Sequence, residues 1–139
     1  MASLVFDSFV DDLAHGLIDF DADVFYALLV TSAYLPDKGM HTKRSDVTDE
    51  VTGTGYTFGG RQSAVTVTKD TANHRVSAAF APVVWPTATI TARGAVLYKR
   101  RGLSATADEL VAYVDFGSDV TSTNDRFTVT FTTPLTLQN

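Results

Sequence analysis

The chain has 139 residues, a formal net charge of −5 at pH 7 and no cysteine. Its length fits one domain with a substantial core, and its 45% hydrophobic and 19% charged residues exclude a disordered tail. The absence of cysteine excludes disulfides and cysteine-ligated metal centres, and the negative charge argues against a nucleic-acid partner.

Residues 1–16 predict an amphipathic helix. Apolar side chains recur at helical spacing from Phe6 to Leu17, and acidic residues occupy the other side. Ser3 is expected to cap the start of this helix, and Gly16 its end. The segment lacks the basic region of a secretory signal, and the chain contains no apolar run long enough to cross a membrane. We therefore expect no membrane partner.

Residues 17–139 predict a β-sandwich interrupted by one long loop at 33–62. The run Val24–Val30 is continuously apolar, as in a strand buried on both faces. Alternating segments predict the remaining strands: Val65–Thr68 and Val76–Phe80 as a hairpin, then Ile90–Tyr98, Leu110–Phe116 and Phe127–Phe131. The expected fold is mainly β and has a single domain. It is an antiparallel sandwich, jelly-roll-like, or a small barrel, with one N-terminal helix.

The stretch EVTGTGYTFGG, residues 50–60, raises the possibility of a phosphate-binding loop. Gly55 and Gly60 have the spacing of that motif, but Arg61 and Gln62 stand where it requires lysine and a hydroxyl residue. A strand is also predicted to follow where the motif requires a helix. We interpret these glycines as residues that permit positive φ in a sharply turning loop, and we predict no nucleotide site.

No other pattern indicates chemistry. Asp19, Asp21 and Asp23 alternate as in a calcium loop, but the glycine and distal glutamate of that loop are missing. On a strand these carboxylates would share one solvated face. The three histidines lie far apart, and no nucleophile-elbow motif is present. We predict no catalytic residue, no metal and no cofactor, and therefore a protein that is not an enzyme.

Two further features allow alternative interpretations. The basic cluster Lys99–Arg101 ends a predicted strand, where it would either meet acidic groups of a partner or keep a hairpin tip soluble. Asp108 and Glu109 are interpreted as a turn before the next strand. Trp85 is assigned to the core rather than to an interface, although tryptophan serves in both.

The sequence resembles a family of small tailed-phage virion proteins. The shared segments are an N-terminal helix, DFDADVF (19–25), TSAYLPD (31–37), SDVTDEVTGTGYTFGG (45–60), VTKDTANHRV (67–76), TARGAVLYKRRG (91–102) and ELVAYVDFGSD (109–119). The resemblance covers nearly the whole chain. It implies a capsid cement or decoration protein that is made in the host cytoplasm and lies on the virion exterior. Its partner would be the major capsid protein, and it would self-associate as a dimer or trimer.

Residue types then suggest which positions meet the shell. In the long loop, Tyr34, Tyr56 and Phe58 are expected to supply apolar anchors, with glycines allowing close backbone approach. Basic side chains are expected to meet acidic shell surface: Lys43, Arg44, Lys99, Arg100 and Arg101. Changing Tyr56 and Phe58 to alanine should weaken shell binding and leave the isolated fold intact. The helix would either mediate self-association or cover one end of the sandwich.

Two other functions remain open from the sequence. The first is a phage tail, neck or baseplate component, for which small β-rich domains are also used. The second is a receptor- or carbohydrate-binding module, suggested by the threonine-rich strands with Tyr26, Tyr98 and Tyr113. Its only candidate binding loop is the polar stretch GSDVTSTND, residues 117–125.

Overall fold

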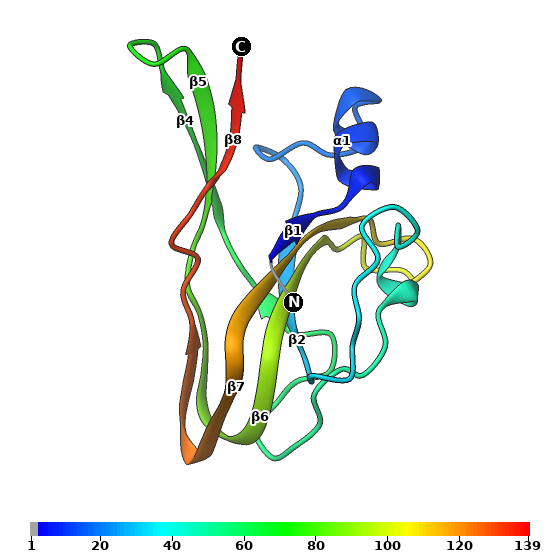
Figure 1. The fold of residues 1–139 in the computed structure, drawn as a ribbon, viewed down its shortest axis with the longest axis vertical. Coiled ribbons are helices and arrows are strands. Elements are labelled where there is room, and N and C mark those ends of the chain that lie inside the picture. Colours follow the sequence, from blue (N-terminus) through cyan, green and yellow to red (C-terminus); the bar gives the residue numbers. More distant parts are fainter. Residues whose placement is uncertain (1–2) are drawn as a thin grey trace.

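Two antiparallel sheets and one short helix make up residues 3–139, which the computed structural model describes (Figure 1). One sheet has five strands in the order β1-β7-β6-β2-β3, and the other has three in the order β4-β5-β8. The strands are β1 (Leu4–Val5), β2 (Phe25–Val30), β3 (Arg61–Gln62), β4 (Val65–Asp70), β5 (Arg75–Phe80), β6 (Val83–Lys99), β7 (Leu110–Val129) and β8 (Leu135–Gln138). The helix α1 spans Asp7–Ala14, and a short 3-10 turn, η1, spans Arg44–Asp46. The mainly β prediction is confirmed, but the sheets do not close into a barrel and a jelly roll is not confirmed.

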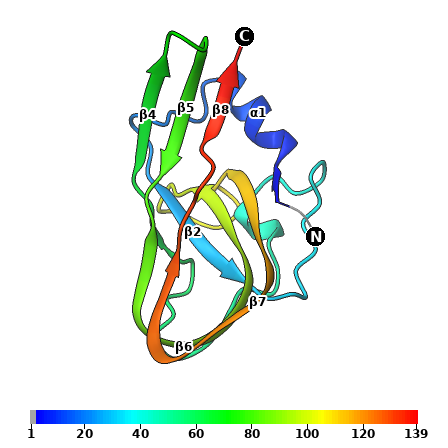
Figure 2. The same ribbon diagram turned by 60° about the vertical axis from the view of Figure 1, so that its left-hand side comes forward.

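The long hairpin of β6 and β7 organises the fold. Its strands pair from Tyr98↔Leu110 near the connecting loop to Val83↔Val129 at the far end. The register shifts between Trp85 and Ala88, and again before Ile90, where the ribbon bends back on itself at the lower end of Figure 2. The first part of β6 and the last part of β7 therefore return toward the three-stranded sheet.

This hairpin corrects one sequence-based prediction. Residues 117–125 are not a loop between two strands, because they continue β7 without interruption. Gly117 and Asn124 adopt positive φ of 83° and 48°, and they act as irregularities within the ladder instead of ending it. The predicted strand at Phe127–Phe131 is accordingly the end of β7, which stops at Val129.

The core has two parts, one on each face of the five-stranded sheet. Between the sheets, Trp85 is fully buried and contacts Tyr56 and Phe127, which confirms its assignment to the core. On the other face, Leu28 and Val96 pack beneath the long loop. Five of the six residues of β2 are buried, as its apolar run predicted.

The N-terminal helix is shorter than predicted. Phe6 occupies the N-cap position, and Leu4 and Val5 pair with Tyr113 and Ala112 of β7. Ser3 therefore caps nothing, and its hydroxyl instead accepts a hydrogen bond from the Asp115 N–H at 2.8 Å. Residues 1–2 of the predicted helix lie outside the described part of the chain.

The end of the helix is as predicted. Gly16 has φ of 74°, and Leu17 N–H reaches back to the Asp12 carbonyl at 2.8 Å while Gly16 N–H reaches Leu13 at 3.2 Å. This is the paired arrangement in which a left-handed glycine satisfies the last helical carbonyls. Among the described residues, no helix is long and apolar enough to cross a membrane.

The three-stranded sheet forms an arm. In Figures 1 and 2 its strands rise beyond the five-stranded sheet, with α1 beside them and the C-terminus at the same end. The hairpin β4–β5 was predicted, and its turn lies at Thr71–His74.

Candidate interaction surface

The long loop lies tightly against the five-stranded sheet, and its glycines make this possible. A methyl group at Gly55 would lie 1.9 Å from the Thr87 carbonyl oxygen, and one at Gly60 would lie 1.9 Å from that of Ala27. Both glycines have φ above 80°, so the prediction of positive φ is confirmed. The close backbone approach that we expected at a partner is made here within the chain.

A half-buried carboxylate, that of Glu50, holds the same loop. Glu50 accepts hydrogen bonds from the Tyr56 hydroxyl at 2.7 Å and from Gly59 N–H at 2.6 Å. The Tyr56 oxygen in turn accepts one from Leu29 N–H at 3.0 Å. Burial raises the pKa of Glu50, although these two hydrogen bonds oppose the shift. Burial and the Glu50 charge also raise the pKa of Tyr56, which stays a neutral donor.

Tyr34 is likewise a structural residue. Its side chain is buried, its hydroxyl lies 2.9 Å from His41 Nδ1, and the two rings stack at 5.6 Å between centroids. The structure therefore places both Tyr34 and Tyr56 inside the loop that they were expected to project from. Neither presents an apolar anchor at the surface.

Two of the three cations in the basic cluster are ion-paired within the chain. Arg101 donates two hydrogen bonds to the carboxylate of Glu109, at 2.7 and 2.6 Å. Lys99 Nζ lies 2.9 Å from Asp23 and 2.6 Å from the Leu17 carbonyl. Of these basic side chains, Arg101 is 35% exposed and Lys99 11%. Both cations therefore form ion pairs within the chain.

Asp108 and Glu109 correct a second prediction, because they are buried ion-pair partners and not a solvated turn. Asp108 accepts from Arg44 Nε at 2.8 Å and from Arg101 N–H at 2.9 Å. Burial opposes ionisation of Glu109, but the hydrogen bond from Arg101 and the charges of Lys43 and Arg101 lower its pKa overall. Lys43 is half-buried, and its backbone forms a bridge with Glu109.

Arg100 differs from its two neighbours. Its guanidinium carbon lies 4.4 Å above the ring of half-buried Tyr26, and within residues 3–139 no ion pair is recorded for it. The Tyr26 ring lies 6.1 Å from that of Tyr98, over which Arg44 is placed at 5.2 Å. Arg100 is thus an exposed cation held on an aromatic face.

Phe58 completes this surface. It is 75% exposed, and the adjoining Gly59 carbonyl accepts a hydrogen bond from the Tyr98 hydroxyl. We call the surface formed by Tyr26, Arg44, Phe58 and Arg100 the Tyr26 surface. Of the eight predicted contact residues, Arg44 and Arg100 lie over the neighbouring rings of Tyr98 and Tyr26, and Phe58 precedes the glycine that is bonded to Tyr98. Contact of any of the eight with a partner stays a prediction.

The sequence suggested Tyr26 as one of three tyrosines of a carbohydrate-binding module and not as a shell contact, since it lies within an apolar strand and resembles a core residue there. A signal for Arg100 was nevertheless present. Side chains alternate along a strand, so Lys99 and Arg101 share one face and Arg100 takes the other. That alternation separates the exposed cation from the two that are ion-paired.

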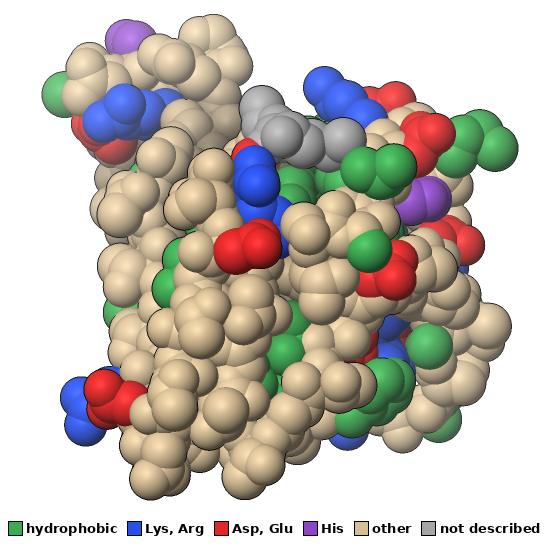
Figure 3. Space-filling model, turned by 60° about the horizontal axis from the view of Figure 1, so that its bottom comes forward, with side chains coloured by type: hydrophobic (Ala, Val, Ile, Leu, Met, Phe, Trp, Pro, Cys, Tyr) green, Lys and Arg blue, Asp and Glu red, His purple; other side chains and the backbone are tan. Residues whose placement is uncertain are grey.

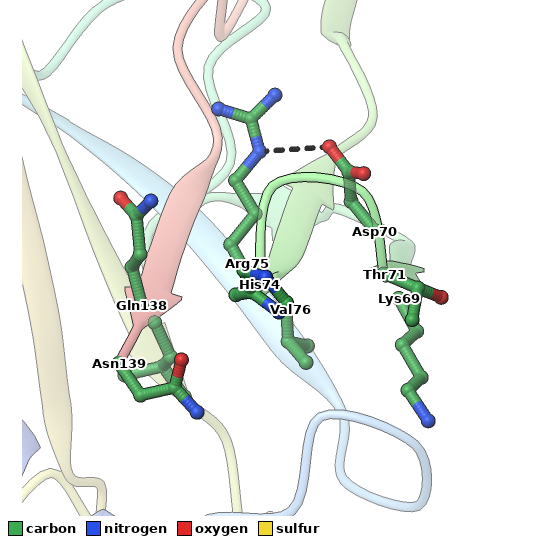
Figure 4. A pocket seen from close by; sticks show the side chains of 9 residues that line it. Lys69, Asp70, Thr71, His74, Arg75, Val76, Gln138 and Asn139 are labelled. Atoms are coloured by element: carbon green, nitrogen blue, oxygen red, sulfur yellow. Dashed lines mark hydrogen bonds and ion pairs between the residues drawn. The ribbon is translucent and has the colours of Figure 1, made fainter.

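The remaining polar clusters do not converge on a ligand. In the hollow at the tip of the β4–β5 hairpin, Arg75 turns toward Asp70 at 3.1 Å while Lys69 extends away (Figure 4). Asp19–Asp23 forms a turn and not a strand, in which Asp23 accepts from Asp19 N–H at 2.7 Å. No group of three potential metal ligands occurs within the described residues. On the face in Figure 3, the Lys and Arg side chains lie beside acidic ones and form no continuous basic patch.

Comparison with protein-family models, with curated proteins and with solved structures finds no match. A functional proposal for this chain therefore depends on the Tyr26 surface and on the sequence resemblance described above.

Proposed function

We propose that the chain is a non-enzymatic cement or decoration protein of a tailed phage, which binds the outside of the major capsid protein lattice and stabilises the shell. The observation that carries this proposal is the Tyr26 surface, where an arginine without an ion pair in the described chain lies on a tyrosine and an exposed phenylalanine projects from the loop that is bonded to the neighbouring Tyr98. The sequence resemblance supplies the class of partner. The capsid exterior is then the location of the mature protein.

The composition of this surface suits protein recognition. Arginine, tyrosine and phenylalanine are enriched at interfaces, and arginine and tyrosine often dominate their binding energy. Arg100 needs to break no internal ion pair in order to meet a carboxylate of a partner. Tyr26 holds its guanidinium in place, so that less side-chain entropy is lost on binding.

The rigid loop supports the same role. Phe58 projects from a backbone fixed on both sides, because Tyr56 before it is hydrogen-bonded to Leu29 and Glu50, and the Gly59 carbonyl after it accepts from Tyr98. A protein that binds only the assembled shell stabilises it by mass action, and many copies multiply a weak contact. Strong individual contacts are therefore unnecessary.

Co-sedimentation with preformed empty shells tests the proposal. We expect Arg100→Ala and Phe58→Ala each to weaken binding about tenfold, equivalent to about 1.4 kcal/mol. The matched control is Arg126→Ala, which removes another exposed arginine, in β7. Binding by Arg100→Ala should also depend less on salt than binding by the parent chain. Equal affinity of parent, Arg100→Ala and Phe58→Ala for shells would remove the Tyr26 surface from the proposal.

The number of copies in purified particles tests the capsid assignment itself. A ratio to the major shell protein that matches the shell lattice would support a cement protein. A few copies per particle would favour a tail, neck or baseplate component. Absence from particles combined with glycan binding on an array would favour the receptor- or carbohydrate-binding module, although the stretch 117–125 that suggested it lies within β7.

A further inference from the structure

The outer edge of β4 is the longest regular free strand edge in the described part of the chain. In the five-stranded sheet, the edge strands β1 and β3 have only two residues each. The strand β7 is longer, but its pairing is irregular: Phe116–Asp119 bulge opposite Arg93, and the register shifts again on both sides of the Ala88↔Asp125 pair. In the three-stranded sheet, β8 has four residues and β4 has six. Natural proteins usually shorten, bend or charge such an edge, because it is a template for another strand.

The backbone of β4 is arranged for further pairing. Ala81 N–H donates to the Ala64 carbonyl at 2.8 Å, so Ala64 directs its backbone groups toward β5. Along an antiparallel pair, successive residues direct their N–H and C=O groups alternately toward the partner strand and away from it. The N–H and C=O groups of Val65, Val67 and Lys69 therefore point toward the free edge.

The side chains of the same residues leave an apolar surface incomplete. Val67 lines a shallow apolar hollow together with Phe9, Val76 and Leu137, between the arm and α1. Val67 is nevertheless 45% exposed, because β4 has no neighbouring strand on that side. A strand paired with the edge would cover it.

We propose that β4 pairs antiparallel with β4 of a second copy of this chain, about a two-fold axis at Val67. The three strands of each copy then form one continuous sheet. In this register Val67 lies opposite its own counterpart, Thr66 lies opposite Thr68, and Lys69 lies opposite Val65. Apolar and threonine pairs of this kind stabilise neighbouring strands, and no like charges oppose each other.

The edge itself favours a second copy over a foreign strand, because its sequence is complementary to itself about Val67. Moving the axis to Thr68 would place Lys69 opposite Val67 and remove the central apolar pair. A two-fold contact uses the same edge of both molecules and closes at a dimer. Pairing of β4 with β8 of the next copy would instead propagate into an open polymer.

The mass of the purified chain in solution, without shells, tests this proposal separately from the proposed function. Sedimentation or light scattering should give a dimer for the parent. Val67→Lys and Val67→Glu should each be monomeric, because the axis places like charges opposite each other. A mixture of the two variants should recover the dimer, since lysine then faces glutamate. The control is Val120→Lys, which changes a similarly exposed valine, 42% against 45%, in β7 and should remain dimeric.

Hydrogen exchange gives a second readout. The amides of Val65, Val67 and Lys69 should exchange slowly in the parent and quickly in Val67→Lys, whose thermal unfolding would show that it still folds. A monomeric parent, a Val67→Lys dimer as stable as the parent dimer, or an open polymer would each overturn the proposal. So would a failure of the two charged variants to dimerise when mixed, provided that each is folded.

Discussion

Arg101 and Glu109 face each other across the loop that joins β6 to β7, and both guanidinium–carboxylate contacts are short, at 2.7 and 2.6 Å. The Glu109 side chain is 1% exposed and that of Arg101 is 35% exposed. Removing the arginine would leave a buried carboxylate without its charged partner. Such a loss is more destabilising than the loss of a solvated ion pair.

Arg101→Ala should therefore lower the free energy of unfolding by about 3 kcal/mol. Arg100→Ala is the adjacent control, and it removes only a surface contact with Tyr26, of about 0.5–1 kcal/mol. Urea unfolding at pH 7, followed by the fluorescence of buried Trp85, measures both. Equal losses for the two variants would contradict the assignment of Arg101 as a structural residue and Arg100 as a free one.

The dependence of stability on pH should have contributions of opposite sign from two glutamates. The pKa of Glu109 is lowered in the folded state, from an ordinary value of 4.5. Its stabilising contribution is therefore present above pH 4.5 and is lost as pH falls through the lowered pKa. The pKa of Glu50 is raised, so the folded state loses stability as pH rises above 4.5 toward that raised pKa.

Two variants separate these contributions. Below pH 4.5 the unfolded Glu109 carboxyl binds more protons than the native one, so the unfolding free energy rises with pH. Glu109→Gln removes this difference and should flatten the rise. Glu50→Gln should make the curve rise more steeply above 4.5. Urea unfolding between about pH 3 and pH 7, the range in which carboxylates titrate, measures the slopes. Slope changes of the same sign would contradict the opposite shifts.

Local signals predicted the parts of the fold that local interactions determine. The apolar run at Phe25–Val30 indicated a doubly buried strand, and Gly16 indicated the end of the helix. The bend of the β6–β7 hairpin was not predictable in this way. Pro86 and the polar stretch 117–125 both suggest breaks in a strand. They cause shifts of register instead, because pairs on either side of them, such as Trp85↔Phe127 and Ala92↔Val120, keep the hairpin together.

In the candidate surface, too, local sequence predicted some features and contacts between distant residues determined the others. The sequence identified the residue types that form it but not their partners. Arg101 and Arg100 are neighbours of the same type. Alternation along the strand places them on opposite faces, but the structure is needed to show that buried Glu109 is the partner of Arg101. Tyr56 and Phe58 are both aromatic and two positions apart, yet one is held by Glu50 and the other is exposed.

The loop glycines should differ from a glycine of the same conformation in open surroundings. Gly55 and Gly102 have φ of 83° and 80°, so alanine is strained by about 1–2 kcal/mol at either position. A methyl group at Gly102 meets nothing within 4 Å, whereas at Gly55 it would overlap the Thr87 carbonyl. Gly55→Ala should therefore destabilise the chain at least twice as much as Gly102→Ala in thermal unfolding. Equal losses of stability for the two variants would show that the loop can move away from the Thr87 carbonyl at no cost in free energy.

Tyr56 and Phe58 should also respond differently, and this alters the expectation that both can be removed with the fold intact. Tyr56→Phe deletes only a hydroxyl, but it leaves Leu29 N–H without its acceptor and Glu50 without one donor. The expected loss is about 1–3 kcal/mol of unfolding free energy. Phe58→Ala removes a side chain that is 75% exposed, and its effect should stay within about 0.5 kcal/mol.

Comparing both variants in urea unfolding and in shell binding separates structural from recognition roles. Phe58→Ala should bind shells more weakly at unchanged stability, while Tyr56→Phe should lose stability and bind nearly as the parent does at temperatures where it is folded. A Tyr56→Phe chain as stable as the parent would mean that the Glu50 network does not hold the loop. In that case Phe58 would project from a mobile segment, and its contribution to binding would be reduced by the entropy of ordering that segment.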